Sequence, residues 1–153
     1  MNHNDPDILE RLAEEFPGEF TVVDAIDQPT ISTSLKQLLA VMQYLRDQAQ
    51  YRICLDVLAV DYLPDRPRFE LVYHLYNPWK HARIRVKVRA GINEKVPSVT
   101  ALWPGANWPE REAYDLFGIQ FEGHPDLRRI YLPDDWDGHP LRKDYPLTGT
   151  RVD

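Results

Sequence analysis

Hydrophobic residues recur with helical spacing in two segments of the first third of the chain. The first segment follows Asp5-Pro6, a pair typical of a helix start, and its apolar stripe ends at Phe16, just before Pro17-Gly18. The second segment, Leu35–Leu45, follows a Ser-Thr-Ser run at 32–34 that supplies candidate N-caps. The pattern therefore predicts two amphipathic helices.

Four segments have the alternation or the composition of β-strands: Phe20–Ile26, Arg52–Val60, Phe69–Tyr76 and Ala82–Arg89. Arg52–Val60 is apolar on one face and nearly so on the other, which predicts a central place in the sheet. Short connections favour antiparallel pairing, because a parallel pair needs a crossover of about a dozen residues. We therefore expect an α+β domain with a mostly antiparallel, roughly four- to five-stranded sheet and helices packed on one face.

A third helix is predicted from Asn107 to Phe117. Asn107 is its candidate N-cap, and Gly118 is a typical residue just past a helix end. Arg111 and Asp115 lie four positions apart, so we expect them to pair on the helix surface. A solvated, capped surface helix is the simplest interpretation of this acidic segment.

The residues after Gly118 combine several prolines and Gly-His-Pro steps with few periodic apolar positions. Such a segment lacks the material for a core of its own, and proline supplies no backbone donor. The sequence thus predicts a compact domain over residues 1–118 and an extended C-terminal docking tail over residues 119–153.

Composition narrows the class of protein. The 153 residues suffice for one domain with a core, and no apolar run approaches the roughly 20 residues that span a bilayer. The acidic N-terminal segment is unlike a secretory signal or a transit peptide. Cys54 is the only cysteine, which excludes an internal disulfide, a Cys-rich zinc site and a cysteine-ligated iron–sulfur cluster within this sequence.

The net charge of −6 is unevenly distributed. Residues 1–65 carry 4 basic and 12 acidic side chains, residues 66–95 carry 8 and 2, and residues 96–153 carry 6 and 10. The basic middle allows a nucleic-acid-binding module or contact with an acidic neighbour, although a solvated sheet face explains the alternation equally well. The basic residues of this strip are Lys80, Arg83, Arg85, Lys87 and Arg89.

Two enzymatic alternatives are weaker. Histidines and acids in the tail could serve a metal hydrolase, but they lack the helical spacing of a zincin. These candidate ligands are His124, Asp126, Asp134, Asp135 and His139. Tyr114–Gly118 superficially resembles the kinase Asp-Phe-Gly motif, yet Leu116 interrupts it and no kinase catalytic loop is present.

The strongest signal is the string EREAYDLFGIQFEGHPDLRRI, followed by LPDDW and GHPLRKDYP. It closely resembles the signature of the C subunit of bacterial NADH:quinone oxidoreductase, respiratory complex I. The resemblance is strong from Val96 to Pro146 and weaker upstream. Pro109 before Glu110 and Tyr131 after Ile130 are small departures from the family's pattern.

The resemblance implies a structural and assembly subunit of the hydrophilic arm that binds no cofactor itself. NAD, FMN, iron–sulfur clusters and quinone are then expected in partner subunits, chiefly the large quinone-site subunit and its iron–sulfur neighbours. The location implied is peripheral, on the cytoplasmic side of the bacterial inner membrane, with membrane contact only through the complex and no nucleic acid bound. A related membrane-bound hydrogenase or ferredoxin-linked quinone reductase is the alternative assembly.

The resemblance also implies that the isolated chain has no catalytic, cofactor-binding or metal-ligating residue. What it transfers to this sequence is a partner interface, in which arginine and aromatic side chains suit docking. The residues that match are Glu110, Arg111, Glu112, Tyr114, Asp115, Phe117, His124, Pro125, Asp126, Arg128, Arg129, Trp136, His139, Pro140, Arg142, Lys143, Asp144 and Tyr145.

Overall fold

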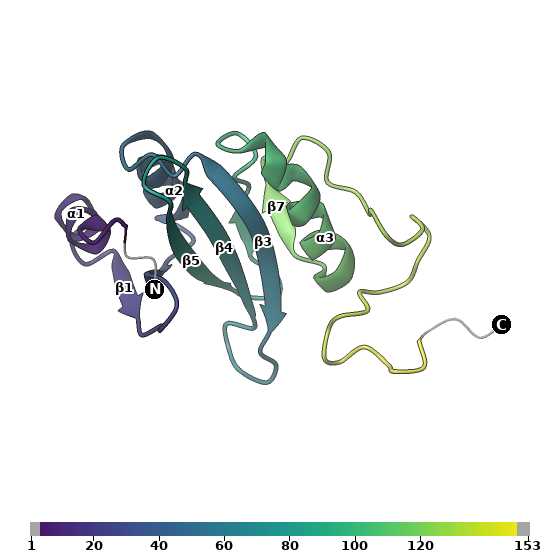
Figure 1. Ribbon diagram of the computed structural model, residues 1–153. Coiled ribbons are helices and arrows are strands. Elements are labelled where there is room, and N and C mark those ends of the chain that lie inside the picture. The colour runs from purple at the N-terminus through teal and green to yellow at the C-terminus, as the bar shows by residue number, and fades with distance from the viewer. Residues whose placement is uncertain (1–3, 150–153) are drawn as a thin grey trace.

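The computed structural model describes residues 4–149. Three α-helices, one 3₁₀ helix and two sheets make up this part of the chain (Figure 1). In chain order the elements are α1 (Ile8–Glu15), β1 (Phe20–Val23), β2 (Thr30–Thr33), α2 (Leu38–Asp47), β3 (Ile53–Asp61), β4 (Phe69–Asn77), β5 (Ala82–Ala90), β6 (Lys95–Pro97), η1 (Pro104–Ala106), α3 (Asn107–Phe117) and β7 (Gln120–Glu122).

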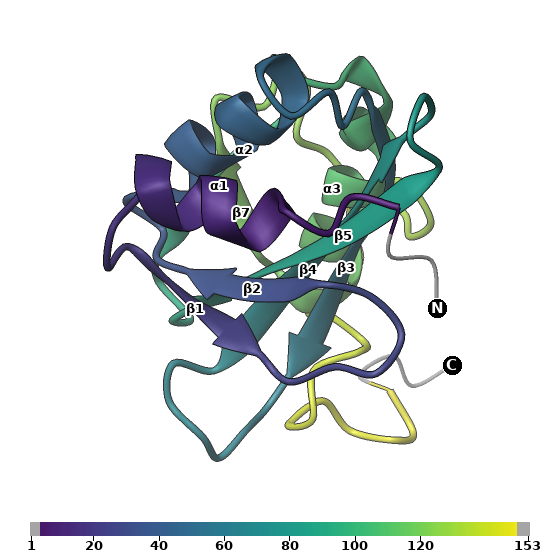
Figure 2. The same ribbon diagram turned by 60° about the vertical axis from the view of Figure 1, so that its left-hand side comes forward.

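The larger sheet has five strands in the order β1-β2-β5-β4-β3. Every neighbouring pair is antiparallel except β2 and β5, which run parallel. Figure 2 shows α1 and α2 lying next to each other over the β1–β2 side of this sheet. The α+β class and the mostly antiparallel sheet are therefore confirmed.

One core joins the helices to the sheet. Ile8 and Leu12 of α1 are fully buried, as are Met42 and Leu45 of α2. From β5, the alternate residues Ile84, Val86 and Val88 enter the same cluster. The two amphipathic stripes and the alternation of Ala82–Arg89 were thus predicted correctly, because each is a local pattern that matches the period of its element.

Two predictions for the sheet are wrong. Arg52–Val60 was expected in the centre, but β3 lies at the edge and pairs only with β4 among the strands of its sheet. Residues 32–34 were expected to cap a helix, but Thr30–Thr33 forms β2 and α2 begins only at Leu38; of the three, Ser34 alone makes a cap-like bond, in which its hydroxyl accepts the backbone N–H of Gln37 at 3.3 Å. β-branched residues suit a strand, and here Thr33 donates its hydroxyl to the carbonyl oxygen of Glu19 across the hairpin at 3.0 Å.

A second, two-stranded sheet is completed after the third helix. β7 pairs in parallel with β6, and Ile119 and Phe121 are buried in the core. The expected domain boundary at Gly118 therefore falls within this packing, just before two core residues. The division into a compact domain and a docking tail stays a prediction.

The third helix has the expected extent but a different N-terminus. Asn107 is its first helical residue and provides no side-chain cap, because the 3₁₀ turn η1 leads directly into the helix. Gly118 ends α3 in the left-handed conformation, with φ of 75°. This agrees with its predicted place just past the helix C-terminus.

Candidate partner interface

The signature begins on α3, which packs beside the edge strand β3. Ala113 is buried, and the ring of Phe117 meets that of Phe69 edge-on at 6.3 Å between centroids. The chain then runs through β7 and continues as an extended segment along the outside of α3 (Figure 1). Few apolar contacts hold this segment, so its polar bonds explain its course.

Asp115 is the main anchor of that segment. Its fully buried carboxylate accepts the backbone N–H groups of Ile130, Tyr131 and Leu132 at 2.8–3.1 Å. The other carboxylate oxygen accepts from the Arg129 guanidinium at 2.8 Å. Burial opposes ionisation of Asp115, but these four donors outweigh it and hold the pKa of the carboxyl below its usual value.

Arg129 links the helix to the distal part of the tail. Besides Asp115, its guanidinium donates to the carbonyl oxygens of Trp136 and Gly138 at 3.1 and 2.8 Å. Arg111 donates to the carbonyl oxygens of Arg128 and Arg129. The expected pair of Arg111 with Asp115 is therefore wrong. Asp115 instead binds Arg129 and the backbone of 130–132, and Arg111 donates to backbone carbonyl oxygens of the tail.

A second anchor lies at the end of the β3–β4 hairpin. The buried Arg68 guanidinium bonds both oxygens of Asp61, at 2.9 and 2.8 Å, and both oxygens of Asp144, at 3.2 and 2.7 Å. Asp61 also accepts the backbone N–H of Lys143 at 2.8 Å. Arg68 holds the pKa of Asp61 far below its usual range and also lowers that of Asp144.

Gly118 allows the tail to close onto the end of α3. A Cβ atom at this position would lie 2.5 Å from Nη2 of Arg142 and 2.6 Å from Cδ2 of His139. Arg142 donates to the carbonyl oxygen of Phe117 at 2.6 Å and stacks over the ring of Phe69. A side chain at position 118 would displace this contact.

Glu110 is buried on the side of α3 that faces Ser98 and Val99. Its carboxylate accepts from the Ser98 hydroxyl at 2.6 Å and from the backbone N–H of Val99 at 2.8 Å. Burial raises the pKa of Glu110 to about 7, and the two hydrogen bonds only partly oppose this. Burial and the nearby Glu110 raise the pKa of the Cys54 thiol to about 12, so this thiol is not an activated nucleophile.

The structure divides the signature residues into two groups. Glu110 and Asp115 have no exposed surface within the chain, and their bonds are intramolecular. Arg128 is exposed, with 68% of its side chain accessible, and Tyr131 is 66% exposed. The structure thus brings the signature residues together on α3 and on the tail that follows it. Their role in binding a partner stays a prediction.

The candidate metal ligands are not brought together. A ring nitrogen of His124 faces the carbonyl oxygen of Asn107, and one of His139 faces that of Asp115. Among residues 4–149, no group of three or more His, Cys, Asp or Glu side chains is arranged to hold a metal ion. Nor does any helix in this part of the chain have the length and apolarity needed to cross a membrane.

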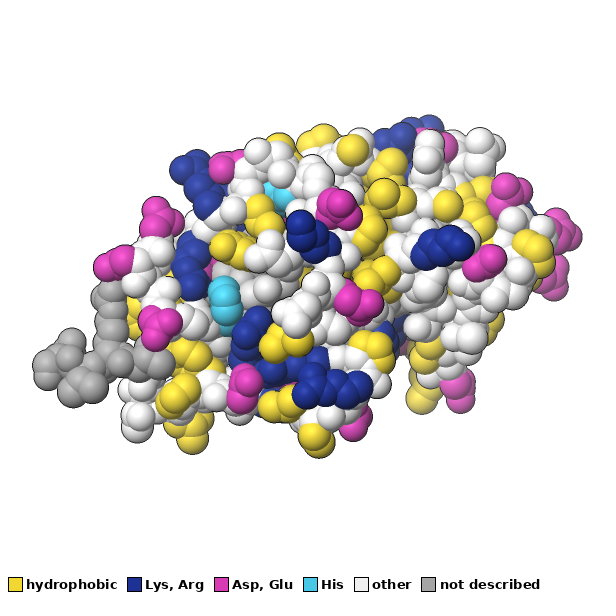
Figure 3. Space-filling model, turned by 180° about the vertical axis from the view of Figure 1, so that it is seen from behind, with side chains coloured by type: hydrophobic (Ala, Val, Ile, Leu, Met, Phe, Trp, Pro, Cys, Tyr) yellow, Lys and Arg dark blue, Asp and Glu magenta, His cyan; other side chains and the backbone are white. Residues whose placement is uncertain are grey.

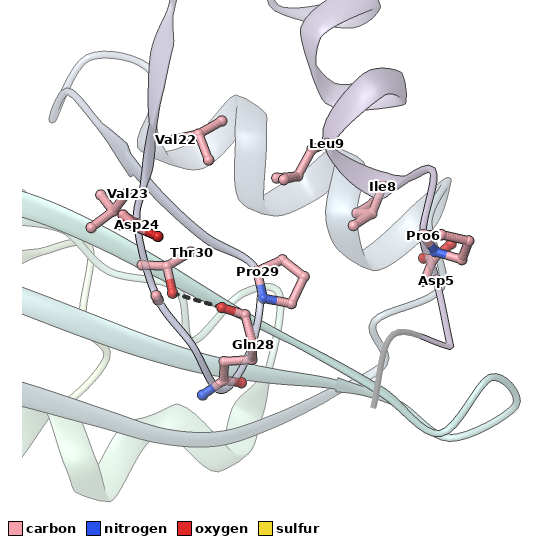
Figure 4. A pocket seen from close by; sticks show the side chains of 11 residues that line it. Asp5, Pro6, Ile8, Leu9, Val22, Val23, Asp24, Gln28, Pro29 and Thr30 are labelled. Carbon is pink, nitrogen blue, oxygen red and sulfur yellow. Dashed lines mark hydrogen bonds between the residues drawn. The ribbon is translucent and has the colours of Figure 1, made fainter. Parts of the chain in front are cut away.

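A hollow near the N-terminal helix lies away from the signature. It has a volume of about 230 Å³ and lies between α1 and the β1–β2 hairpin. Its walls are largely apolar, and Leu9 and Val22 approach it from opposite sides (Figure 4). Asp5 at its rim is engaged by Arg11, Lys80 and Tyr51.

Basic side chains on β5 are largely engaged within the chain. Arg85 pairs with Asp27 at 2.7 Å, and Arg89 donates to the carbonyl oxygen of Pro67. Seen from behind, Lys and Arg side chains gather near the lower middle of the molecule, next to a histidine and hydrophobic groups (Figure 3). The surface in this view mixes basic with acidic and apolar groups.

Residues 31–151 match the family described as respiratory-chain NADH dehydrogenase, 30 Kd subunit. The match includes the entire signature and most of the sheet. The chain belongs to this family. Membership confirms the resemblance that the sequence from Glu110 to Pro146 indicated.

Curated relatives in this family support the same assignment. The C subunit of the NADH-quinone oxidoreductase of Sinorhizobium medicae is 54% identical over 123 residues, which are 78% of this chain and 61% of that protein. Its counterpart from Geobacter sulfurreducens is 46% identical over 144 residues, covering 91% of this chain and 88% of the relative. The chain thus spans only about three fifths of the first of these relatives.

Two solved structures share the fold. The trypsin-resistant fragment (1-134) of Nqo5 is 34% identical, with a TM-score of 0.69, and the match covers 78% of this chain and 98% of the fragment. A chain of the membrane-bound sulfane sulfur reductase, an archaeal respiratory membrane complex, is 25% identical with a TM-score of 0.75. That match covers 93% of this chain and 85% of the archaeal chain.

Sequence reasoning missed three residues that position the family's signature here. Asp61 and Arg68 flank the β3–β4 connection and bind the tail, and Ser98 holds Glu110. The tail partners of Asp61 and Arg68 lie 82 and 76 positions away, so no local spacing reveals them. The only local signal for this anchor was the charge of Asp61 at the end of the apolar strand β3.

Replacing Asp115 with Asn should release the tail. One oxygen and the negative charge disappear, which leaves Arg129 without its ionic partner, and we expect a loss of about 3 kcal/mol in the free energy of unfolding. Urea unfolding measures this loss, and hydrogen exchange should show faster exchange of the amides at 130–132. Asp126→Asn, which breaks an exposed pair, is the control and should cost under about 1 kcal/mol. Unchanged exchange at 130–132 in Asp115→Asn would refute the anchor.

The raised pKa of Glu110 predicts a pH-dependent stability. Glu110 binds its proton more tightly in the folded chain, so its contribution is complete below its ordinary pKa of 4.5 and is lost as the pH rises through about 7. Relative to Glu110→Gln, the natural chain should lose about 2–3 kcal/mol between these pH values. Chemical unfolding across this range measures the difference. Glu122→Gln, at an exposed position, should run parallel to the natural chain, and a parallel course for Glu110→Gln would contradict the assignment.

Proposed function

We propose that this chain is a non-catalytic structural and assembly subunit of a NADH:quinone oxidoreductase of the complex I type. The observation that carries the proposal is the pairing of family membership with a tail that is fixed in place by Asp115 and Arg68. The tail presents side chains suited to docking on an already ordered backbone. Order before binding reduces the conformational entropy that is lost when an extended segment is captured.

The proposed partners are the large quinone-site subunit and the neighbouring iron–sulfur subunits. The exposed part of the signature, including Arg128 and Tyr131, is suited to such contacts, because arginine and aromatic residues dominate the energetics of many interfaces. In this proposal NAD, FMN, the iron–sulfur clusters and quinone are bound by those partners and not by this chain. The buried, high-pKa thiol of Cys54 accords with a chain that does no redox chemistry of its own.

The proposed location is peripheral, on the cytoplasmic side of a bacterial inner membrane, with membrane contact made only through the complex. The archaeal neighbour belongs, by its name, to a respiratory membrane complex. Its likeness over 93% of this chain favours a second candidate, the corresponding subunit of a related membrane-bound reductase or hydrogenase. The two candidates differ in whether a NADH-oxidising flavin subunit is present in the assembly.

A pull-down from native membranes tests the proposal directly. The tagged chain should recover a flavin subunit, iron–sulfur subunits and the large quinone-site subunit, identified by mass. Iron–sulfur and large subunits recovered without a NADH-oxidising flavin subunit would favour the second candidate. Recovery of none of these subunits would refute both.

The exposed part of the signature should govern this recovery. Changing Arg128 and Tyr131 to Ala removes an exposed cation and an exposed ring, so we expect about a 10-fold lower yield of the partner subunits. Thermal unfolding of the isolated variant should match that of the natural chain, because both side chains point outward. The matched control is Arg52→Ala with Trp79→Ala, an exposed cation and ring outside the signature. Equal yields for the two double variants would contradict the predicted interface.

A further inference from the structure

The edge strand β3 has the composition of a central strand. On its inner face, Val57 and Ala59 contribute to the packing of the sheet against α3. On its outer face, Ile53, Leu58 and Val60 stay 41%, 45% and 37% exposed. Large apolar side chains on a sheet edge are a liability that proteins normally cover or interrupt with charge.

The register places these three residues at the ends of rows that cross the outer face of the sheet. Each row begins with an apolar residue of β3, crosses β4, and ends with a basic residue of β5. These three rows are Ile53-Tyr76-Arg83, Leu58-Val72-Lys87 and Val60-Glu70-Arg89, and a fourth row between the first two, Asp56-His74-Arg85, begins with an acid. Except at Asp56, the outer face therefore changes from apolar to basic over about 10 Å, the width of three strands.

The cations of this face are only partly neutralised. Glu70 lies 3.5 Å from Lys87 and 3.9 Å from Arg89, so one carboxylate serves two cations. Arg83 stacks on the ring of Tyr76, and none of the ion pairs formed among residues 4–149 includes it. The face consequently keeps a net positive charge along β5 that a partner's carboxylates can neutralise.

The apolar surface also continues around the edge of the sheet. A groove of about 160 Å³ lies between β3 and α3, and Leu58, Leu116 and Leu141 line it. Leu141 belongs to the tail, in the part that carries the family signature. The outer face of β3 is therefore continuous with the surface proposed above to meet the large subunit.

Addition of a partner strand to this edge fits the structure poorly. The pairing of β3 shifts register between Cys54 and Asp56, which marks a bulge. The Asp56 carboxylate accepts the backbone N–H of Val57 at 2.8 Å, so that donor is already engaged. Contact with a partner must therefore be made mainly through side chains.

We propose that an amphipathic helix of a neighbouring subunit docks on this outer face. One side of the helix is apolar and covers Ile53, Leu58 and Val60, and its adjacent flank is acidic and faces Arg83 and Lys87. A helix about 10 Å across matches the length of one row across three strands, and its i, i+3, i+4 spacing supplies both stripes. This inference rests on the proposed function, because the helix belongs to another subunit of the same assembly.

The test uses the full chain in the native assembly. Leu58→Glu with Val60→Glu adds carboxylates to the apolar part of the face and should lower the recovery of partner subunits about 10-fold. Leu39→Glu is the matched control, because Leu39 is a similarly exposed leucine, 43%, on helix α2, and its recovery should stay within about 2-fold of the natural chain. Thermal unfolding of the isolated control should be unchanged, and that of the double variant should fall by only a few degrees, because Leu58 and Val60 are half-exposed and position 60 lies opposite Glu70.

Two further experiments test the need for a cation at position 83 and the identity of the docked partner. Arg83→Glu should lower recovery about 5-fold and Arg83→Lys should retain it, because the proposed contact needs a cation. A photo-crosslinking residue at position 58 should label an acidic amphipathic helix in another subunit. Labelling of a second copy of this chain, of lipid or of nucleic acid would overturn the inference, as would normal recovery of Leu58→Glu with Val60→Glu.

These results separate the inference from the proposed function. If the Arg128 and Tyr131 double variant loses its partners while the β3 variants keep them, the helix-docking inference fails and the proposed function stands. If the natural chain recovers no flavin, iron–sulfur or large subunit, the proposed function itself fails.

Discussion

A buried carboxylate on α3 determines where the last quarter of the chain lies. The segment after β7 is too polar to build a core, yet Asp115 binds three consecutive backbone N–H groups and the Arg129 guanidinium. A buried charge is costly unless donors surround it, and four donors satisfy this one. The tail and the carboxylate therefore depend on each other, because the tail supplies the donors that the buried carboxylate needs and the carboxylate holds the tail in place.

The same principle operates at the far end of the tail. Arg68 is buried between Asp61 of the domain and Asp144 of the tail, and the backbone of Lys143 closes the arrangement. Both anchors join a group fixed by the sheet or by α3 to backbone that has no regular secondary structure. A strip fixed at two points presents its outward side chains at set positions, which is what a subunit interface requires of a segment without a core.

The elements that could be predicted are those specified by neighbours in sequence. Alternation identified the inward Ile84, Val86 and Val88, and Gly118 marked the end of α3. The Asp115–Arg129 pair could not be found in this way, because Arg111 offered a partner at standard helical spacing while the true partner lies on the tail. Local rules describe exposed pairs well, but the burial of Asp115 is decided by tertiary packing.

The two errors in the sheet have different physical meanings. Thr30–Thr33 was missed as a strand, but it pairs with β5, so its place in the sheet is explained by contacts within the chain. The composition of β3 indicated a strand covered on both faces, and within residues 4–149 its outer face is left open. Consistency between local sequence and final environment is the rule in natural proteins, and departures concentrate at functional surfaces. The first mismatch is resolved by the fold itself, so only the second supports the proposed docking of another chain.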